Sequence, residues 1–244
     1  MKVYEFIKKR SESKQKTFAL LVDPSKTDAE KLRKIGKLSD KAQVDVFFVG
    51  GSILFNDQLK MCLKTLRENS KIPVVLFPGN NLQIDSNADA ILFLSLISGR
   101  NPEMLIGKHV VAAPYVKAAK LEAIPTGYML IESGKLTTAH YMSNSLPIPS
   151  GKSEIAACTA LAGEMLGMKL IYMDAGSGAE RPVPTEMITA VKKEIQVPLI
   201  IGGGLRKPQD AANACKAGAD MIVVGTAFEE NPSLIQKFAE AIHK

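Results

Sequence analysis

The last third of the chain reads Leu170-Ile-Tyr-Met-Asp-Ala-Gly-Ser-Gly-Ala179, then Leu199-Ile-Ile-Gly-Gly-Gly204, then Met221-Ile-Val-Val-Gly-Thr226. Each segment is a short apolar run that ends in a glycine-rich turn. Apolar runs of this length are typical of strands that are buried on both faces of a parallel sheet. The three segments therefore predict consecutive parallel strands whose glycine turns meet at one end of the sheet.

Similar apolar runs precede these three, and helical patterns separate them. The expected strands are Phe18–Val22, Asp45–Val49, Val74–Phe77, Ala90–Leu94, Tyr128–Ile131, Leu170–Met173, Leu199–Ile201 and Met221–Val224. Strands that alternate with helices form βαβ units around a parallel sheet. Eight such units make a (βα)8 barrel of about 250 residues, and the chain has 244. The sequence predicts an α/β protein, a single TIM barrel over residues 1–244.

The connection between the fourth and fifth expected strands is irregular. Pro114 interrupts the helical pattern of Asn101–Ala119, so any helix there is expected to be broken or shortened. After the fifth strand, Ala139–Pro149 is expected as an extended loop, because Pro147 and Pro149 restrict the backbone around Ile148. No low-complexity linker or shift in composition divides the chain, which favours one domain.

Composition excludes several classes of protein. The net charge of +6 suits an anionic ligand, but acidic residues are interspersed with the basic ones and no basic–aromatic alternation is present, so no nucleic-acid partner is expected. No apolar run approaches the roughly 20 residues of a membrane span, and the first residues lack the apolar core of a secretory signal. The three cysteines are far apart and form no metal-binding pair. These features favour a cytoplasmic protein.

The glycine turns predict a phosphate site. In a TIM barrel, active sites lie at the carboxyl ends of the strands, and phosphate often binds to the loops after strands seven and eight. The turns at Gly176–Gly178, Gly202–Gly204 and Gly225 stand there. Glycine lets backbone amides approach an anion closely, and Ser177 and Thr226 offer hydroxyl donors. Tight-turn geometry alone is the alternative explanation.

The first half of the chain carries a different pattern. Asp23 follows the first expected strand, and Ser52 follows the second. A carboxylate beside a serine hydroxyl suits Mg²⁺, which prefers oxygen ligands and keeps waters and substrate phosphates. Equally, Asp23 caps a turn before Pro24. The residues alone do not separate these two interpretations. Lys26 either reaches a phosphate or is a solvated lysine at the start of a helix.

Apolar or small residues end the central strands, as at Phe77, Leu94 and Glu132–Gly134. An apolar floor between two anion sites would suit a long hydrocarbon. Ordinary barrel packing explains any one of these side chains equally simply.

Taken together, these motifs resemble the geranylgeranylglyceryl phosphate synthase family along nearly the whole chain. The matching segments are Leu21-Val-Asp-Pro-Ser-Lys26, Phe48-Val-Gly-Gly-Ser52, Tyr172-Met-Asp-Ala-Gly-Ser-Gly-Ala179, Ile201-Gly-Gly-Gly-Leu205 and Val224-Gly-Thr-Ala227. Ser98-Gly-Arg-Asn-Pro-Glu103, Pro125-Thr-Gly-Tyr128 and Pro147-Ile-Pro149 look like the branch with archaeal and some bacterial members. The order and spacing of the motifs make the match specific.

The resemblance implies Mg²⁺-dependent transfer of geranylgeranyl from its diphosphate to the 3-hydroxyl of sn-glycerol 1-phosphate, which gives an ether-lipid precursor. It implies that Asp23 and Ser52 are metal ligands. The candidate base is Asp174, because a carboxylate within hydrogen-bond reach can take the hydroxyl proton. The implied glycerol phosphate site comprises Tyr172, Met173, Asp174, Ala175, Gly176, Ser177, Gly178, Gly203, Gly204, Gly225 and Thr226. It also implies a homo-oligomer, and a lipid substrate implies transient membrane contact.

Two positions depart from the family pattern. Asp174 stands where the family usually has Glu, so the expected base is one methylene shorter, and Thr226 stands where Asn is common. Alternative functions are the same reaction with another donor, such as a heptaprenyl diphosphate, or a phosphate-binding barrel isomerase or synthase. A non-enzymatic barrel that binds a phosphorylated ligand is a third possibility.

Overall fold

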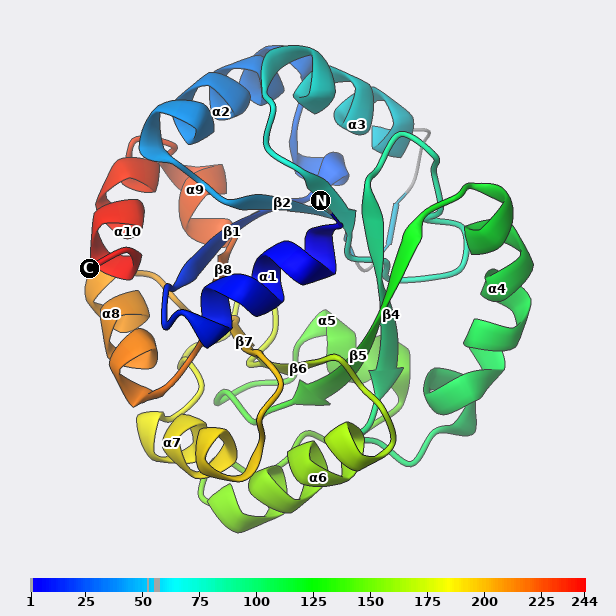
Figure 1. The fold of residues 1–244 in the computed structure, drawn as a ribbon, viewed down its shortest axis with the longest axis vertical. Coiled ribbons are helices and arrows are strands. Elements are labelled where there is room, and N and C mark those ends of the chain that lie inside the picture. The colour runs from blue at the N-terminus through cyan, green and yellow to red at the C-terminus, as the bar shows by residue number, and fades with distance from the viewer. Residues whose placement is uncertain (1, 52, 55–57) are drawn as a thin grey trace.

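The computed structural model describes residues 2–51, 53–54 and 58–244. Its strands pair in parallel and form a closed barrel in the order β1 to β8 (Figure 1). The strands are β1 (Thr17–Val22), β2 (Val46–Val49), β3 (Val74–Leu76), β4 (Ala90–Leu96), β5 (Glu122–Leu130), β6 (Leu170–Asp174), β7 (Leu199–Gly202) and β8 (Met221–Val224). Because β1 pairs with both β2 and β8, the ring has no free edge. The predicted TIM barrel is confirmed.

Helices surround the barrel (Figure 1). The longer ones are α1 (Val3–Glu12), α2 (Ala29–Ala42), α3 (Gln58–Asn69), α4 (Lys108–Ala118), α6 (Ser153–Met165), α7 (Thr185–Glu194), α8 (Pro208–Ala217) and α10 (Leu234–Ile242). Short helical segments are η1 (Pro24–Lys26), η2 (Glu103–Gly107), α5 (Thr138–Ser143) and α9 (Thr226–Glu230). Residues 77–89 join β3 to β4 without a helix. Among the described residues, no helix has the length and apolar content needed to cross a bilayer.

Strand side chains alternate between two packed layers, as the pleat of a strand requires. Phe48 and Tyr172 point into the barrel and belong to the inner cluster of buried side chains. Their chain neighbours Phe47 and Met173 point outward and pack in the second cluster, beneath the helices. The apolar runs therefore read as continuous because both faces of every strand are buried.

Helix α1 covers the end of the barrel where the strands begin (Figure 1). Val3 and Ile7 are buried and pack with the inner cluster. The Glu122 carboxylate at the start of β5 accepts the backbone N–H groups of Val3 at 2.7 Å and Tyr4 at 3.3 Å. These bonds satisfy donors that the first turn of a helix leaves unpaired. Helix α1 thus closes this end of the barrel.

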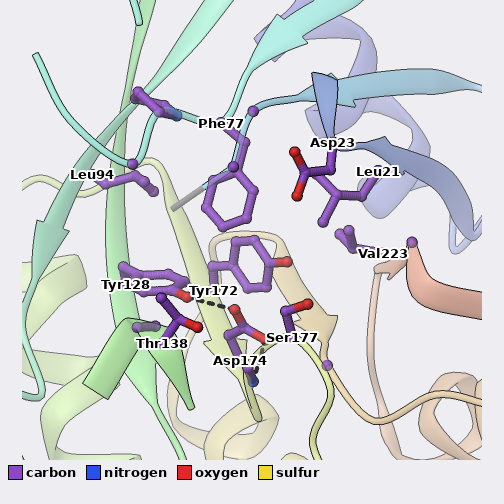
Figure 2. Close-up of a pocket in the computed structure, with 18 of the residues that line it drawn as sticks. Leu21, Asp23, Phe77, Leu94, Tyr128, Thr138, Tyr172, Asp174, Ser177 and Val223 are labelled. Carbon is purple, nitrogen blue, oxygen red and sulfur yellow. Dashed lines mark hydrogen bonds between the residues drawn. The ribbon is translucent and has the colours of Figure 1, made fainter. Parts of the chain in front are cut away.

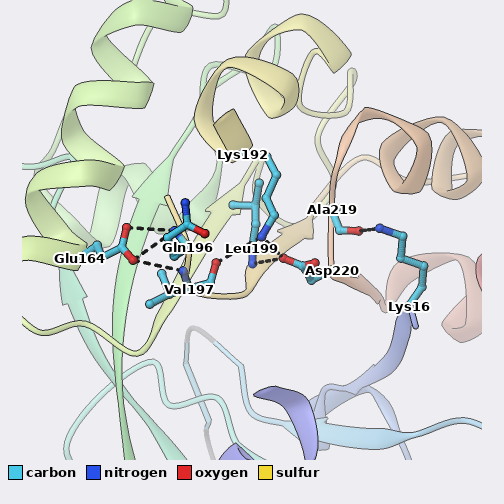
Figure 3. Close-up of polar contacts among 8 residues, drawn as sticks. All are labelled: Lys16, Glu164, Lys192, Gln196, Val197, Leu199, Ala219 and Asp220. Carbon is cyan, nitrogen blue, oxygen red and sulfur yellow. Dashed lines mark hydrogen bonds and ion pairs between the residues drawn. The ribbon is translucent and has the colours of Figure 1, made fainter. Parts of the chain in front are cut away.

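Polar contacts also fasten the starts of β7 and β8 at the closed end (Figure 3). Asp220 Oδ2 accepts the Leu199 N–H at 2.8 Å and pairs with Lys192 Nζ at 2.7 Å. Glu164 on α6 accepts the N–H of Val197 at 3.2 Å. Because these carboxylates satisfy backbone donors at or just before the start of β7, they fix where this strand enters the barrel.

The irregular connection between β4 and β5 differs in detail from the expectation. A π-helical turn, η2, leads into α4, which continues through Pro114 for 11 residues, so the prediction of a broken helix was wrong. Proline removes one helical hydrogen bond. The carbonyl that loses its partner belongs to Val110, which is exposed, so the loss costs less than it would in the core.

The segment after β5 was also predicted incorrectly. Residues 138–143 form helix α5 instead of an extended loop. Its first turn is stabilised by a capping box in which the Thr137 N–H donates to His140 Nδ1 at 2.9 Å. The remainder is extended, because Ile148 pairs with Ile131 in an isolated parallel bridge.

The close approach of β2 and β3 generates a stability prediction. A methyl group on Gly50 would lie 1.9 Å from the Phe77 carbonyl oxygen. We expect Gly50→Ala to push the two strand ends apart and to lower the free energy of unfolding by about 1–3 kcal/mol. Urea denaturation measures this loss. Gly151→Ala is the matched control, because nothing lies within 4 Å of its added carbon. Equal losses in both variants would contradict the steric explanation.

Candidate active site

A cavity of about 610 Å³ opens at the end of the barrel where the strands finish (Figure 2). Its volume lies in the usual range for small-molecule sites. Side chains on or just after the strands line it, including Leu21, Asp23, Phe77, Leu94, Tyr128, Tyr172, Asp174 and Val223. The closed ring brings these residues together from distant parts of the chain. This is the face at which TIM barrels carry their active sites.

Most of the predicted site residues line this cavity. They are Asp23, Tyr172, Asp174, Gly176, Ser177, Gly178, Gly203, Gly204, Gly225 and Thr226. Met173 and Ala175 do not, because both are fully buried and pack in the outer cluster. Met173 points outward for the same reason that its neighbours Tyr172 and Asp174 point inward. Ser52 lies outside the described residues.

The glycine turns after β6 and β7 pack closely against each other. Gly176, Gly178, Gly203 and Gly204 have φ angles of +90°, +73°, +78° and +69°, in a region where a side chain is strained. A carbon added to Gly203 would also lie 2.5 Å from Asp174 Oδ1. Glycine at 203 therefore serves two purposes, the turn itself and the space for the neighbouring carboxylate.

Asp174 is a buried carboxylate at the end of β6. It is 7% exposed. Its Oδ1 accepts the Gly176 N–H at 2.7 Å, and its Oδ2 accepts the Tyr128 hydroxyl at 2.5 Å (Figure 2). Burial raises the pKa of Asp174, while the hydrogen bonds from Tyr128 and Gly176 and the nearby His140 oppose that rise. A carboxylate in a cavity with a raised pKa is suited to accept a proton.

Three aromatic rings pack together beside this carboxylate, and one of them, Tyr128, is bonded to it. Phe77 stacks on Tyr172 with ring centroids 5.4 Å apart, and Tyr128 meets both rings edge-on at 5.9 and 5.4 Å. Sequence reasoning missed Tyr128 as a site residue. The alternation of the strand could have revealed it. Tyr128 shares the inward face of the strand with Ile124, and its polar hydroxyl at such a position indicates a site residue.

Asp23 both caps a turn and faces the cavity. Its Oδ1 accepts the Ser25 N–H at 3.0 Å and the Ser25 hydroxyl at 2.8 Å, and its Oδ2 lies 3.6 Å from Lys26 Nζ. A carbon added to Gly51 would lie 2.7 Å from Asp23 Oδ1. The turn-capping interpretation is therefore correct, and Asp23 also lines the cavity.

Asp23 is the one of the two predicted metal ligands that the described residues include. Within the described ranges, no three His, Cys, Asp or Glu side chains are grouped to hold a metal. The Asp23 side chain, which is 18% exposed, offers a carboxylate oxygen as a hard ligand. Such a ligand fits Mg²⁺, which commonly takes one or two carboxylates and completes its shell with water and substrate phosphates. The second predicted ligand, Ser52, is not among the described residues.

Gln83 connects the loops after β2 and β3 and was not predicted. It is 2% exposed. Its side-chain amide donates to the Gly51 carbonyl at 2.8 Å and accepts the Gly79 N–H at 3.1 Å. These two bonds hold the rim of the cavity next to Asp23.

An apolar arm of the cavity extends toward β4 and α4. It is lined by Leu94, Leu96, Met104, His109, Ala112 and Met142. His109 contacts the edge of Phe93 and lies 3.2 Å from the Ser95 hydroxyl. Burial lowers the pKa of His109, which keeps the imidazole neutral at pH 7. Glu132 is not among the residues that line the cavity. Its carboxylate accepts hydrogen bonds from the N–H and the hydroxyl of Ser150.

Helix α5 supports the first glycine turn from behind. A carbon added to Gly176 would lie 2.6 Å from the Thr137 hydroxyl, and Thr137 caps α5 together with buried His140. Burial lowers the pKa of His140, and the Asp174 charge acts against this shift. Sequence reasoning missed this support, because it predicted an extended loop for the segment.

The sequence profile described as the PcrB family matches residues 9–242. The match covers almost the entire barrel. The chain belongs to the PcrB family.

Relatives of this PcrB-family protein include two named geranylgeranylglyceryl phosphate synthase. The one from Chitinophaga pinensis is 49% identical over 242 residues, which cover 99% of this chain and 96% of the relative. The one from Spirosoma linguale is 50% identical over 232 residues, 95% of this chain and 93% of the relative. The prediction of an enzyme of the geranylgeranylglyceryl phosphate synthase family is thereby confirmed.

A solved structure agrees with this PcrB-family barrel over its whole length. It is the (S)-3-O-geranylgeranylglyceryl phosphate synthase of Thermoplasma acidophilum in complex with its substrate sn-glycerol-1-phosphate. The two chains are 31% identical with a TM-score of 0.94, and the match covers 100% of this chain and 99% of the other.

The first glycine turn of this PcrB-family protein generates a prediction. Gly176→Ala must strain a positive φ and also displace Thr137, whereas Gly178→Ala strains the backbone without any atom within 4 Å of the new carbon. We expect Gly178→Ala to cost about 1 kcal/mol and Gly176→Ala clearly more, because overpacking adds to the strain. Thermal unfolding of the two variants measures the difference. An equal loss of stability in both variants would show that Thr137 moves aside without cost.

Proposed function

We propose that this PcrB-family protein transfers a geranylgeranyl group from geranylgeranyl diphosphate to the 3-hydroxyl of sn-glycerol 1-phosphate with Mg²⁺ as cofactor. One observation carries the proposal. The buried Asp174 carboxylate lies in a cavity that joins glycine turns suited to phosphate with an apolar arm suited to a hydrocarbon. The names of the relatives, and the ligand named for the T. acidophilum structure, support the same substrates.

The acceptor end is formed by the glycine turns. Gly176–Gly178, Gly203–Gly204 and Gly225–Thr226 line the cavity. Amides in such turns bind phosphate oxygens without a side chain in the way, and Ser177 and Thr226 would add hydroxyl donors. We place the phosphate of sn-glycerol 1-phosphate here, so that its free hydroxyl lies toward Asp174.

The donor end is formed around Asp23. Lys26 and Gly51 line the cavity beside it, and Lys26 would pair with a phosphate as a point charge. In this proposal Asp23 holds Mg²⁺ together with the diphosphate and, as the resemblance implies, Ser52. Magnesium bound there would supply positive charge for the departing diphosphate. The prenyl chain would occupy the apolar arm past Leu94.

The reaction substitutes one C–O bond for another. The bond between the first prenyl carbon and the diphosphate oxygen breaks, and its electron pair leaves with diphosphate. The 3-hydroxyl oxygen bonds to that carbon, and its proton moves to the Asp174 carboxylate. The protein contributes by positioning the two reactants and by accepting the proton. Because the base must be ionised, the turnover number should fall at low pH. Burial raises the pKa of Asp174, so this fall should begin at a higher pH than the pKa of an ordinary aspartate would give.

The resemblance also supports a homo-oligomer and transient contact with a membrane that holds the lipid donor. The composition supports a cytoplasmic location. The length of the prenyl donor is also part of the proposal, because a heptaprenyl donor would undergo the same chemistry in a longer arm.

Incubation of the protein with Mg²⁺, labelled sn-glycerol 1-phosphate and prenyl diphosphates of graded length tests the reaction. We expect a labelled ether product, with the C20 donor preferred, and no product when Mg²⁺ is chelated. Extraction and chromatography of the lipid phase measure it. Preference for a C35 donor would favour the heptaprenyl alternative, and the absence of product with every donor would refute the transferase.

The metal role of Asp23 is tested by Asp23→Asn. Asparagine keeps an oxygen that can accept the Ser25 N–H, so the turn should remain, but it loses the charge needed for Mg²⁺. We expect turnover to fall about 10²-fold or more, with the affinity for sn-glycerol 1-phosphate within about twofold of the wild type, by calorimetry. Lys34→Gln, a change on α2 away from the cavity-lining residues, is the control. A parallel loss of turnover and of acceptor binding would show that Asp23 is structural.

A further inference from the structure

Tyr128 and Asp174 meet across two neighbouring strands. The register of β5 and β6 pairs Tyr128 with Tyr172 and Leu130 with Asp174. Tyr128 and Asp174 are thus diagonal neighbours on the inner face, within reach of a long side chain. The Tyr128 hydroxyl donates to Asp174 Oδ2 at 2.5 Å (Figure 2). This contact joins residues 46 positions apart and exists only because the two strands lie in this register.

The Tyr128 ring is held in place by its neighbours. Phe77 from the end of β3 and Tyr172 from β6 each contact it edge-to-face, with interplanar angles of 67° and 88°. Edge-to-face pairs stabilise one orientation of a ring, and close packing on two sides opposes its rotation. The hydroxyl therefore approaches the carboxylate from a defined direction.

The second oxygen of the carboxylate is held by the backbone. The Gly176 N–H donates to Asp174 Oδ1 at 2.7 Å. Donors on both oxygens, from two different elements, fix the plane of the carboxylate. Each oxygen still has a lone pair free to accept another hydrogen bond, so the acceptor hydroxyl of a substrate can still be bound.

We propose that Tyr128 is a positioning residue of this enzyme: with the Gly176 N–H, it holds the Asp174 carboxylate in the orientation that accepts the proton of the glycerol hydroxyl. The inference rests on the proposed function, in which Asp174 is the base. The phenol keeps its own proton, because burial, and next the Asp174 charge, raise the pKa of Tyr128 well above its usual range. Tyr128 thus acts as a fixed donor to the base.

The same contact adjusts the charge state of Asp174. The groups that face the carboxylate are Tyr128 on β5, Tyr172 on β6 and His140 on α5. Burial raises the pKa of Asp174 most strongly, and the Tyr128 hydrogen bond lowers it. The pKa of His140 is itself lowered by burial, so this imidazole is mostly neutral at pH 7. Loss of the Tyr128 hydroxyl should therefore raise the pKa of Asp174 further.

Tyr128→Phe tests the proposal, because it removes the hydroxyl and keeps the packed ring. We expect the turnover number to fall about 10- to 100-fold, the loss typical of a hydrogen bond to a charged group. The KM for sn-glycerol 1-phosphate should stay within about twofold. In the pH profile of the turnover number, the fall on the acid side should move to higher pH. A uniform loss at every pH, with the fall on the acid side unmoved, would mean that Tyr128 only fills space and would overturn the proposal.

Tyr115→Phe is the matched control, because Tyr115 is 64% exposed on α4 and does not line the cavity. It should leave both the turnover number and the pH profile unchanged. Circular dichroism and thermal unfolding verify that Tyr128→Phe is folded.

A measurement without substrate separates this inference from the proposed function. Carbon-13 NMR titration of the aspartate carboxyl groups, with the Asp174 signal assigned by its loss in Asp174→Asn, reports the pKa of the base directly. We expect a higher titration midpoint in Tyr128→Phe than in the wild type. An unchanged midpoint would overturn the inference. If the wild type forms no ether product, the proposed function fails, and the titration still decides whether Tyr128 controls Asp174.

Discussion

The pairing of β1 with β8 is the constraint on which the rest of this structure depends. It closes the sheet, so that all strands finish at the same end of one ring. Helix α1 covers the opposite end, where Val3 and Ile7 join the inner core. Inward side chains in the last layer then meet at the open end. Asp23 and Asp174, which are 151 positions apart in the chain, line one cavity as a result.

Glycine lets the loops at this end pack as tightly as the strands beneath them. At Gly51 a side chain would collide with the Asp23 carboxylate, and at Gly203 with that of Asp174. At Gly176 it would collide with Thr137, which connects the first glycine turn to helix α5. The carboxylates are thus oriented by the absence of neighbouring side chains as much as by their hydrogen bonds. Such prior organisation is what a reaction that depends on positioning requires.

The cavity combines charged groups with aromatic and aliphatic side chains. Asp23 and Lys26 lie on the side of β1, and the glycine turns lie on the side of β6 to β8. Phe77, Tyr128 and Tyr172 line the same cavity and contact one another, and Tyr128 donates to Asp174. In the proposed reaction these rings lie beside the base that accepts the proton. The low exposure of Asp174 strengthens each of its electrostatic interactions.

Local patterns in the sequence determined the barrel, because a strand buried on both faces must be apolar throughout and a phosphate turn must contain glycine. They also indicated Asp23, which follows β1, and Asp174, which ends β6, and the order of the motifs indicated the family. Only the tertiary structure decided that residues 138–143 form a helix that supports Gly176, and that β5 begins at Glu122, where its carboxylate binds α1. Only the tertiary structure brought Tyr128 to Asp174. Contacts of this kind depend on strand register and on ring closure, which the short-range spacing of residue types does not encode.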